Sequence, residues 1–219
     1  MNYTELSNAI QAYTENTEAD FVASIPVFVE QAEQRIYNSV QFPSIRRNVT
    51  GSMTTNNKYL QCPTDFLAVY SLAVIKADGT YEYLLNKDVN FIRQAYPLPT
   101  DTDTPRYYAL FGPRSDNPAE LTFILGPTPD AAYGAELHYF FYPPSITVSP
   151  YTSWLGDNFD TVLLYGSLVE AYTYMKGEPD MMALYNGKYQ EALALAKRLG
   201  DGMERQDAYR SGQFRQKVT

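Results

Sequence analysis

The sequence has very few of the residues on which most enzyme and metal chemistry depends. Its 219 residues include one cysteine, Cys62, and one histidine, His138. A single cysteine excludes an internal disulfide, and one cysteine with one histidine cannot supply the usual ligands of a zinc site. A Ser–His–Asp arrangement would have to use His138, and neither a nucleophile-elbow sequence nor a common phosphate-binding glycine loop is present. The sequence therefore predicts a protein that is not an enzyme, with no catalytic residues, no metal and no cofactor.

Long apolar runs and excess positive charge are also missing. No apolar run approaches the roughly 18 residues of a membrane-spanning helix. The opening residues, MNYTE, lack the basic start and apolar core of a signal peptide, which predicts a protein kept in a cytoplasm, away from membranes. The formal net charge is −8, which argues against a general affinity for nucleic acid phosphates. The same charge fits an acidic wall along which DNA slides.

Two residue types are plentiful and leave alternatives open. The sequence has 20 tyrosines and 11 phenylalanines but one tryptophan; tyrosine is common at protein interfaces, and aromatic residues also pack well in strands. Acidic residues gather in loops at Asp101, Asp103 and Asp116. A glycosidase-like carboxylate pair is one interpretation, and solvated turns, which aspartate favours for backbone reasons, are the other.

Apolar residues recur at helical spacing near the N-terminus. A first short segment carries Leu6, Ile10 and Tyr13 on one face, and a second runs from Ile25 to Ile36, with Pro26 expected in its first turn. Residues 1–36 hold six acids and one base, so this end of the chain is strongly acidic.

The C-terminal part has helical patterns of its own. Residues 158–175 are apolar nearly all round, which is typical of a central helix, and Gly166 favours a close helix crossing. A further helix carries a stripe from Met182 to Leu199, and Gly200 and Gly202 are expected to end or bend it. Helices this far apart in sequence most economically form one bundle closed by both ends of the chain.

The middle of the chain changes to a strand pattern. Candidate strands are 47–54, 58–62, 66–76, 81–85, 106–111, 120–125 and 136–142, and residues 87–97 fit a short helix. Asn56-Asn57 and Asp78-Gly79 are suited to hairpin turns. The sequence thus predicts an α+β fold, in which a helical bundle formed by the N- and C-terminal helices carries an inserted antiparallel, sandwich-like β domain. His138 falls on one of these strands, where a lone histidine is expected to be structural.

A series of segments carries a resemblance to a known family. In order they are Tyr3-Thr4-Glu5-Leu6, Asp20-Phe21-Val22, Ile25-Pro26, Gln31-Ala32-Glu33-Gln34-Arg35-Ile36, FPSIRRNVTGSM, Pro63-Thr64-Asp65-Phe66-Leu67, Leu84-Leu85-Asn86-Lys87-Asp88-Val89 and Gly177-Glu178-Pro179-Asp180. Together they resemble the head-to-tail adaptor (connector) proteins of short-tailed bacteriophages, over nearly the whole chain. These are packing and turn signatures, so the specificity comes from their order.

The resemblance implies a structural virion protein of the neck, assembled in the host cytoplasm. Such adaptors form a homo-oligomeric ring, twelve-fold by resemblance, beneath the portal protein. The ring extends the channel through which genomic DNA passes without specific binding, and it gives the tail nozzle and tail-fibre proteins an attachment platform.

The expected organisation follows from pattern and resemblance together. Residues 1–46 would form the N-terminal helices of the bundle, 47–150 the β domain, 151–200 the C-terminal helices and 201–219 an extended segment that docks on the portal. In this segment Arg210, Arg215 and Lys217 would meet acidic groups and Phe214 would anchor apolar contact. Two alternatives stay open, a tail component lower in the same particle and a carbohydrate-binding β module.

Overall fold

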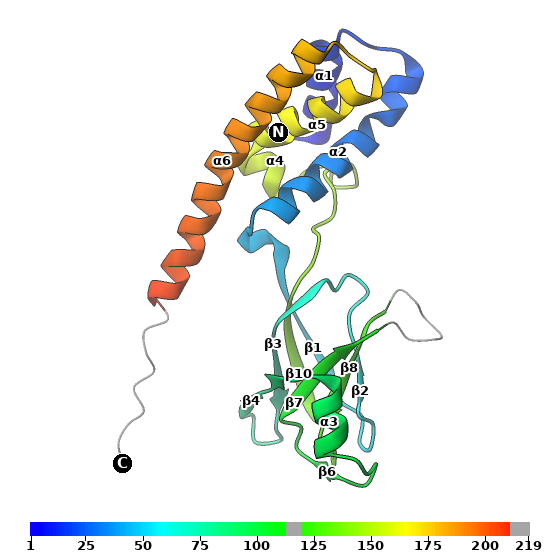
Figure 1. The fold of residues 1–219 in the computed structure, drawn as a ribbon, viewed down its shortest axis with the longest axis vertical. Coiled ribbons are helices and arrows are strands. Elements are labelled where there is room, and N and C mark those ends of the chain that lie inside the picture. The colour runs from blue at the N-terminus through cyan, green and yellow to red at the C-terminus, as the bar shows by residue number, and fades with distance from the viewer. Residues whose placement is uncertain (113–119, 211–219) are drawn as a thin grey trace. The chain divides into compact units, whose positions relative to one another are not determined.

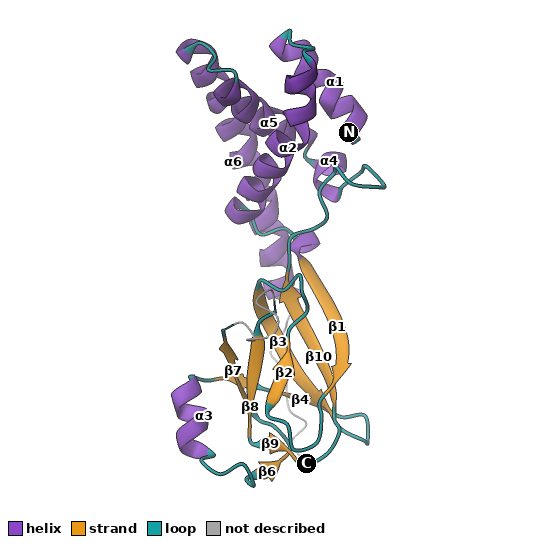
Figure 2. Cartoon of the chain, turned by 90° about the vertical axis from the view of Figure 1, so that its right-hand side faces the viewer, coloured by secondary structure: helices purple, strands orange, loops and turns teal. Residues whose placement is uncertain are grey.

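The chain folds into two compact units, one helical and one rich in strands. The computed structural model describes residues 1–112 and 120–210, and of residues 201–210 it describes the backbone alone. The helical unit consists of Met1–Ile45 with the chain from Tyr142 onward, and the β unit is Arg46–Phe141 (Figures 1 and 2). This confirms the α+β fold class, with helices from both ends of the chain and a β-rich middle.

The helical unit is built around α5. Its elements are α1 (Tyr3–Thr14), α2 (Ala19–Ser39), the 3₁₀ turn η1 (Pro43–Ile45), α4 (Trp154–Asn158), α5 (Asp160–Tyr174) and α6 (Pro179–Arg210). The helices α1, α2, α4 and α6 all contact α5 (Figure 1). A helix with neighbours on several sides needs apolar residues all round, which explains the pattern read from residues 158–175.

Gly166 allows α5 to be approached closely on two sides. A Cβ atom at this position would lie 3.2 Å from the Cβ atom of Ala32 in α2 and 3.2 Å from the ring of Tyr189 in α6. Carbon atoms in good contact are about 3.5–4.0 Å apart. The missing side chain therefore provides the room in which the three helices meet.

Two expectations about the helices were wrong. Pro26 lies inside α2, because this helix begins at Ala19; the lost backbone hydrogen bond is compensated by the burial of Phe21, Ile25 and Phe28. The second concerns an end of the helix at Gly200, since α6 does not end there but continues to Arg210. A helical glycine costs only about 1 kcal/mol, and the space at Gly200 is limited by Val40, whose Cγ1 atom would lie 2.9 Å from an added Cβ.

The β unit consists of two four-stranded sheets and a two-stranded one. Its elements are β1 (Arg46–Ser52), β2 (Tyr59–Gln61), β3 (Ala68–Ile75), β4 (Tyr81–Tyr83), β5 (Leu85–Asn86), α3 (Val89–Ala95), β6 (Thr102–Asp103), β7 (Tyr107–Phe111), β8 (Thr122–Gly126), β9 (Thr128–Pro129) and β10 (Gly134–Phe140). The first sheet has the order β1-β10-β3-β4 and the second β2-β8-β7-β5. All seven candidate strands and the short helix are present.

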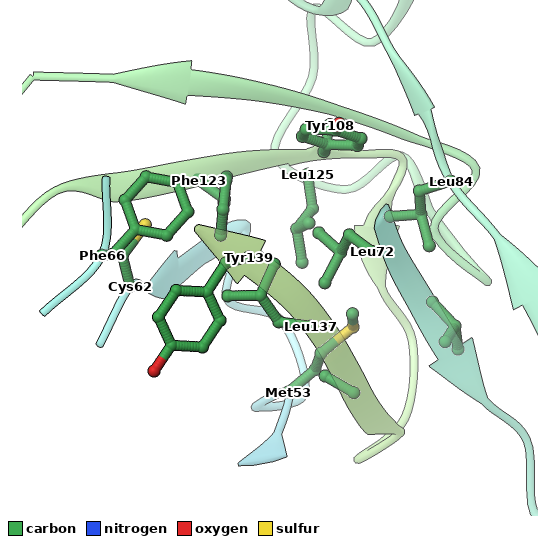
Figure 3. Packing of buried hydrophobic residues seen from close by; sticks show 12 residues of the cluster. Met53, Cys62, Phe66, Leu72, Leu84, Tyr108, Phe123, Leu125, Leu137 and Tyr139 are labelled. Carbon is green, nitrogen blue, oxygen red and sulfur yellow. The ribbon is translucent and has the colours of Figure 1, made fainter. Parts of the chain in front are cut away.

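The core of the β unit lies between the two sheets, as in a sandwich. The first sheet contributes Leu72, Leu137 and Tyr139, and the second contributes Tyr108 and Phe123 (Figure 3). The ring of Phe123 makes T-shaped contacts with Tyr108. Inward residues of β10 alternate with residues on its outer side, which is the period-two pattern of the sequence.

The strands depart from a purely antiparallel arrangement at two short places. β5 pairs with β7 and β6 pairs with β9, and both pairs are parallel. Each covers only two residues per strand, which is too short to leave a period-two pattern in the sequence. The longer pairs, β1–β10, β10–β3 and β7–β8, are all antiparallel.

Candidate interaction surface

The outer side of the first sheet carries a cluster of exposed aromatic rings. We call it the tyrosine face; its members are Arg46, Tyr70, Tyr81, Tyr83, His138 and Phe140. The side chains of Tyr70, Tyr81 and Tyr83 are 61%, 50% and 64% exposed. Exposed tyrosine provides rigid apolar area with a polar tip, which is the chemistry of protein interfaces.

Strand register places these residues on one side of the sheet. Tyr83 pairs with Ala73, which in turn pairs with Glu136 of β10. Since Ala135, Leu137 and Tyr139 of β10 point into the core, Glu136, His138 and Phe140 point outward. A register shift between His138 and Tyr139 leaves Tyr70 of β3 without a partner residue in β10, and such a bulge re-aims the side chain.

Contacts within the tyrosine face order the rings of Tyr70 and Phe140. The ring of Tyr70 makes a T-shaped contact with Phe140 at 6.1 Å between centroids. The guanidinium of Arg46 lies 5.3 Å from the centre of the Tyr70 ring and 5.8 Å from that of Phe140, within the range of cation–π attraction. Tyr81 and Tyr83 lie on β4, at the edge of the sheet.

His138 occupies a structural position in this surface. Its Nδ1 atom lies 3.3 Å from the hydroxyl of Ser71 on the paired strand β3. No group of three or more potential metal ligands occurs among the described residues. The neighbour that the structure gives the His138 ring is thus the Ser71 hydroxyl.

A hydrogen-bonded chain fixes the start of β1 beside the core. The hydroxyl of Tyr139 donates to Asp65 Oδ1 at 2.9 Å, and Arg47 binds Asp65 Oδ2 at 3.0 Å. Burial raises the pKa of the Tyr139 hydroxyl, and its hydrogen bond to Asp65 adds to the effect. Tyr139 therefore stays protonated as a donor.

A groove of about 570 Å³ lies beside the edge strand β2. Its described lining is neutral, with the aromatic rings of Tyr59 and Phe111 and the polar side chains of Asn57, Gln61 and Thr122 among its members. The Oγ1 atom of Thr122 is buried without a hydrogen-bond partner. The described lining offers a ligand aromatic, hydroxyl and amide contacts.

The helical unit holds a buried carboxylate that binds the returning chain. Glu33 of α2 is 3% exposed and accepts a hydrogen bond from the backbone N–H of Ile146 at 3.0 Å. The neighbouring Glu30 accepts one from the hydroxyl of Thr147. Burial raises the pKa of Glu33, against the lowering effect of its hydrogen bonds. The two carboxylates tie residues 146–147 to α2 within the unit.

Asp101 and Asp103 accept hydrogen bonds from nearby backbone N–H groups. Asp101 accepts a hydrogen bond from the backbone N–H of Leu98, and Asp103 accepts one from Thr104. Asp103 also lies 3.6 Å from the guanidinium of Arg106. Asp116 lies outside the described residues. The solvated-turn interpretation accounts for Asp101 and Asp103.

The remaining predicted site residues lie at the end of the chain. Arg210 is the last residue of α6. Phe214, Arg215 and Lys217 lie outside the described residues. Within the described part of the chain, no helix is long and apolar enough to cross a membrane.

The described residues offer aromatic contact area on the tyrosine face, and Glu33, Asp101 and Asp103 accept hydrogen bonds that hold turns and chain segments in place. The family model of the SU10 adaptor protein matches residues 1–216, so the chain belongs to the SU10 adaptor protein family. This confirms the resemblance to phage head-to-tail adaptors, and the protein is a bacteriophage structural adaptor. No curated protein sequence matches the chain.

Proposed function

We propose that this adaptor forms a homo-oligomeric ring beneath the portal protein, extends the DNA channel and carries the tail. The observation that supports it is the family match over residues 1–216. The β-rich middle, with its tyrosine face, would give the platform for the tail nozzle and fibre proteins. In this setting the protein resides in the neck of the virion, after assembly in the host cytoplasm.

The charge of the chain supports passage of DNA without specific binding. The formal net charge is −8, and residues 1–36 hold six acids and one base. Like charges repel DNA phosphates, so an acidic channel wall would not retain the genome. A ring of many copies multiplies this effect.

The C-terminal segment is the proposed contact with the portal. After Tyr209 the sequence is RSGQFRQKVT, with three basic residues and no acid. We assign Arg210, Arg215 and Lys217 to acidic groups of the portal and Phe214 to an apolar contact.

Co-sedimentation of the purified chain with the portal ring of the same genome, followed by imaging, tests the function. A stoichiometric second ring on the portal is the expected result. The paired variant Arg215→Glu with Lys217→Glu should weaken attachment while circular dichroism stays unchanged. A matched charge reversal on the described surface, Lys87→Glu, should leave attachment intact. Undiminished attachment of the C-terminal variant would refute the docking role, and no binding by the unmodified chain would refute the portal contact itself.

A second candidate function rests on the neutral groove beside β2. Aromatic rings with amide and hydroxyl groups suit a carbohydrate, which stacks and hydrogen-bonds without charge. Glycan binding by the purified chain that is lost in Tyr59→Ala would favour a carbohydrate-binding β module. An adaptor role alone predicts no glycan binding in the same titration.

A further inference from the structure

The first sheet of the β unit has two open edges with unused backbone hydrogen-bonding groups. Its order is β1-β10-β3-β4, so β1 and β4 each have one neighbour. Six of the seven residues of β1 are exposed. An exposed edge strand is a template for pairing with another strand.

The ladder pattern identifies which groups of β1 face outward. The N–H of Met53 donates to the carbonyl of Tyr133 at 2.8 Å, and the register of β1 with β10 continues from there. In an antiparallel ladder, alternate residues bond to the partner strand. The N–H and C=O groups of Asn48, Thr50 and Ser52 therefore point away from β10.

The same reasoning applies to β4. The N–H of Leu84 donates to Leu72 and that of Lys76 to Thr80, both at 2.9 Å. Hence the backbone N–H and C=O groups of Glu82 face β3, and those of Tyr81 and Tyr83 face away from β3. Among the described residues, no backbone hydrogen bond is made from the outward edge of either β1 or β4.

The two edges match each other in direction. All three pairings of the sheet are antiparallel, so β1 and β4, at the ends of a four-stranded row, run in opposite directions. A second copy in the same orientation would place its β4 beside β1 as an antiparallel neighbour. The contact joins two different surfaces of one chain, which is the head-to-tail type that generates rings.

The side chains of the two edges differ in charge. β1 contains Arg46 and Arg47 and no acid, whereas β4 contains Glu82 and no base. Through Ala73 and Glu136, Tyr83 lies in the same row of the sheet as Thr50 and on the same side, so an unstaggered continuous sheet brings the exposed Tyr83 ring of one copy beside Thr50 of the next. Arg47 is paired with Asp65 and Glu82 with Lys76 within the chain, which leaves the backbone groups as the main source of affinity.

We propose that β1 of one copy pairs with β4 of the next in an antiparallel ladder, so that the first sheet runs continuously around the ring. This inference rests on the homo-oligomeric ring proposed above and names the surfaces that close it. Four strands per copy, each about 4.8 Å wide, add roughly 19 Å of circumference. Twelve copies would give a sheet of about 230 Å around, or roughly 73 Å across.

Engineered cysteines test the pairing directly. In the ladder, Glu82 lies opposite Arg47, Val49 or Gly51, according to register, in non-hydrogen-bonded pairs whose Cα atoms are about 4.5 Å apart. This spacing permits a disulfide. Full-length chains with Glu82→Cys and one of Arg47→Cys, Val49→Cys or Gly51→Cys should give an intermolecular ladder on a non-reducing gel after mild oxidation. One of the three pairs should dominate and reveal the register.

Controls separate this contact from random collision. Glu82→Cys with Thr50→Cys places the thiols on opposite sides of the sheet, and this pair should not form the ladder. A mixture of the two single variants should give dimers only, as a head-to-tail contact requires. The native Cys62 is buried, and the unmodified chain shows whether it contributes.

Proline substitutions provide an independent measurement. Thr50→Pro removes an N–H that faces the open edge, so the fold should be retained and self-association should fall by at least about tenfold. Thr50→Ala should associate normally. Val49→Pro removes an N–H that faces β10 and should unfold the β unit.

The outcomes distinguish this inference from the function on which it rests. If the unmodified chain forms a ring, alone or on the portal, and none of the three cysteine pairs cross-links, the β1–β4 pairing is refuted and the adaptor function stands. If Thr50→Pro is folded and assembles normally, the pairing is refuted as well. If the unmodified chain forms no ring under either condition, the proposed ring function fails and the pairing fails with it.

Discussion

Adding one methyl group at Gly166 should destabilise the helical unit. In an ordinary helix, replacing glycine by alanine is favourable by about 1 kcal/mol. At Gly166 the new Cβ would lie 3.2 Å from both Ala32 and the ring of Tyr189. Tyr189 is 1% exposed and Ala32 is fully buried, so neither neighbour has free space into which to move.

The expected size follows from these opposing terms. Overpacking a core typically costs about 1–3 kcal/mol. After subtraction of the helix-propensity gain, Gly166→Ala should lower the free energy of unfolding by about 1 kcal/mol. For a chain of this size that corresponds to a fall in Tm of roughly 2–4 °C. Gly166→Val, which adds two more carbons and a β-branch, should lower the free energy of unfolding further.

Gly187 offers a matched control in the neighbouring helix. It lies in α6, and a Cβ there would meet no atom within 4 Å. Gly187→Ala should therefore stabilise the same unit by about 0.5–1 kcal/mol. The assay is urea unfolding followed by circular dichroism at a helical wavelength, with thermal unfolding as a second measure. Equal stabilisation by both alanine substitutions would refute the close approach of α2 and α6 to α5.

A double-mutant cycle then locates the strain. Ala32→Gly removes the Ala32 Cβ atom and leaves Tyr189 as the other near neighbour of the new methyl group. The pair Gly166→Ala with Ala32→Gly should show a favourable coupling energy of at least about 0.5 kcal/mol. Additive effects would mean that Tyr189 alone limits the space.

Three further predictions concern single side chains. Burial raises the pKa of Glu33, so the carboxyl group binds its proton more tightly when folded; its contribution to stability is greatest at low pH and is lost as pH rises from about 4.3 through the raised folded pKa. Urea unfolding between pH 4 and 8 should show this difference between the unmodified chain and Glu33→Gln, and parallel curves would contradict it. Burial also raises the pKa of Cys62 to about 12, so a thiol reagent at pH 8 should react only after unfolding; rapid reaction of the native protein would show that the site is open. Finally, Tyr70→Ala should weaken attachment of tail proteins without lowering Tm by more than about 1 °C, while Tyr59→Ala on the second sheet should not, and equal attachment by the two variants would remove the tyrosine face from the tail platform.

Much of the fold followed from periodicity in the sequence. The strand that became β10 alternates Ala135, Leu137 and Tyr139 with polar or exposed neighbours, and such alternation survives any choice of partner strand. Apolar residues on nearly all faces of α5 similarly predicted a central position for this helix. These patterns are local consequences of how a helix or strand exposes its side chains.

Very short strands, and helix ends that depend on tertiary packing, could not be predicted from the sequence. β6 and β9 have two residues each, which is fewer than one period of any pattern. Pro26 predicted a helix start, yet α2 begins seven residues earlier because its apolar residues gain more from packing than one proline costs. The continuation of α6 through Gly200 reflects the same balance.

The tyrosine face was also only partly predictable from the sequence. Tyrosine content and the i, i+2 spacing of Tyr81 and Tyr83 were visible in the sequence and indicate a strand with two rings on one side. Tyr70 joins them only because a bulge between His138 and Tyr139 shifts the register, and Arg46 joins through a strand paired across the sheet.

The sequence alone determined the order of helices and strands, the scarcity of cysteine and histidine, the acidic charge and the family signature, because each is carried by neighbouring residues or by composition. The tertiary structure decided which distant segments meet: the return of residues 146–147 to Glu33, the close approach at Gly166, and the two open edges of a four-stranded sheet. Those features depend on contacts between segments that lie far apart in the sequence, such as Glu33 with Ile146 and Ala32 with Gly166. Side-chain volume, backbone hydrogen bonding and strand direction together select such pairings. A local sequence pattern does not specify which distant segments will pair.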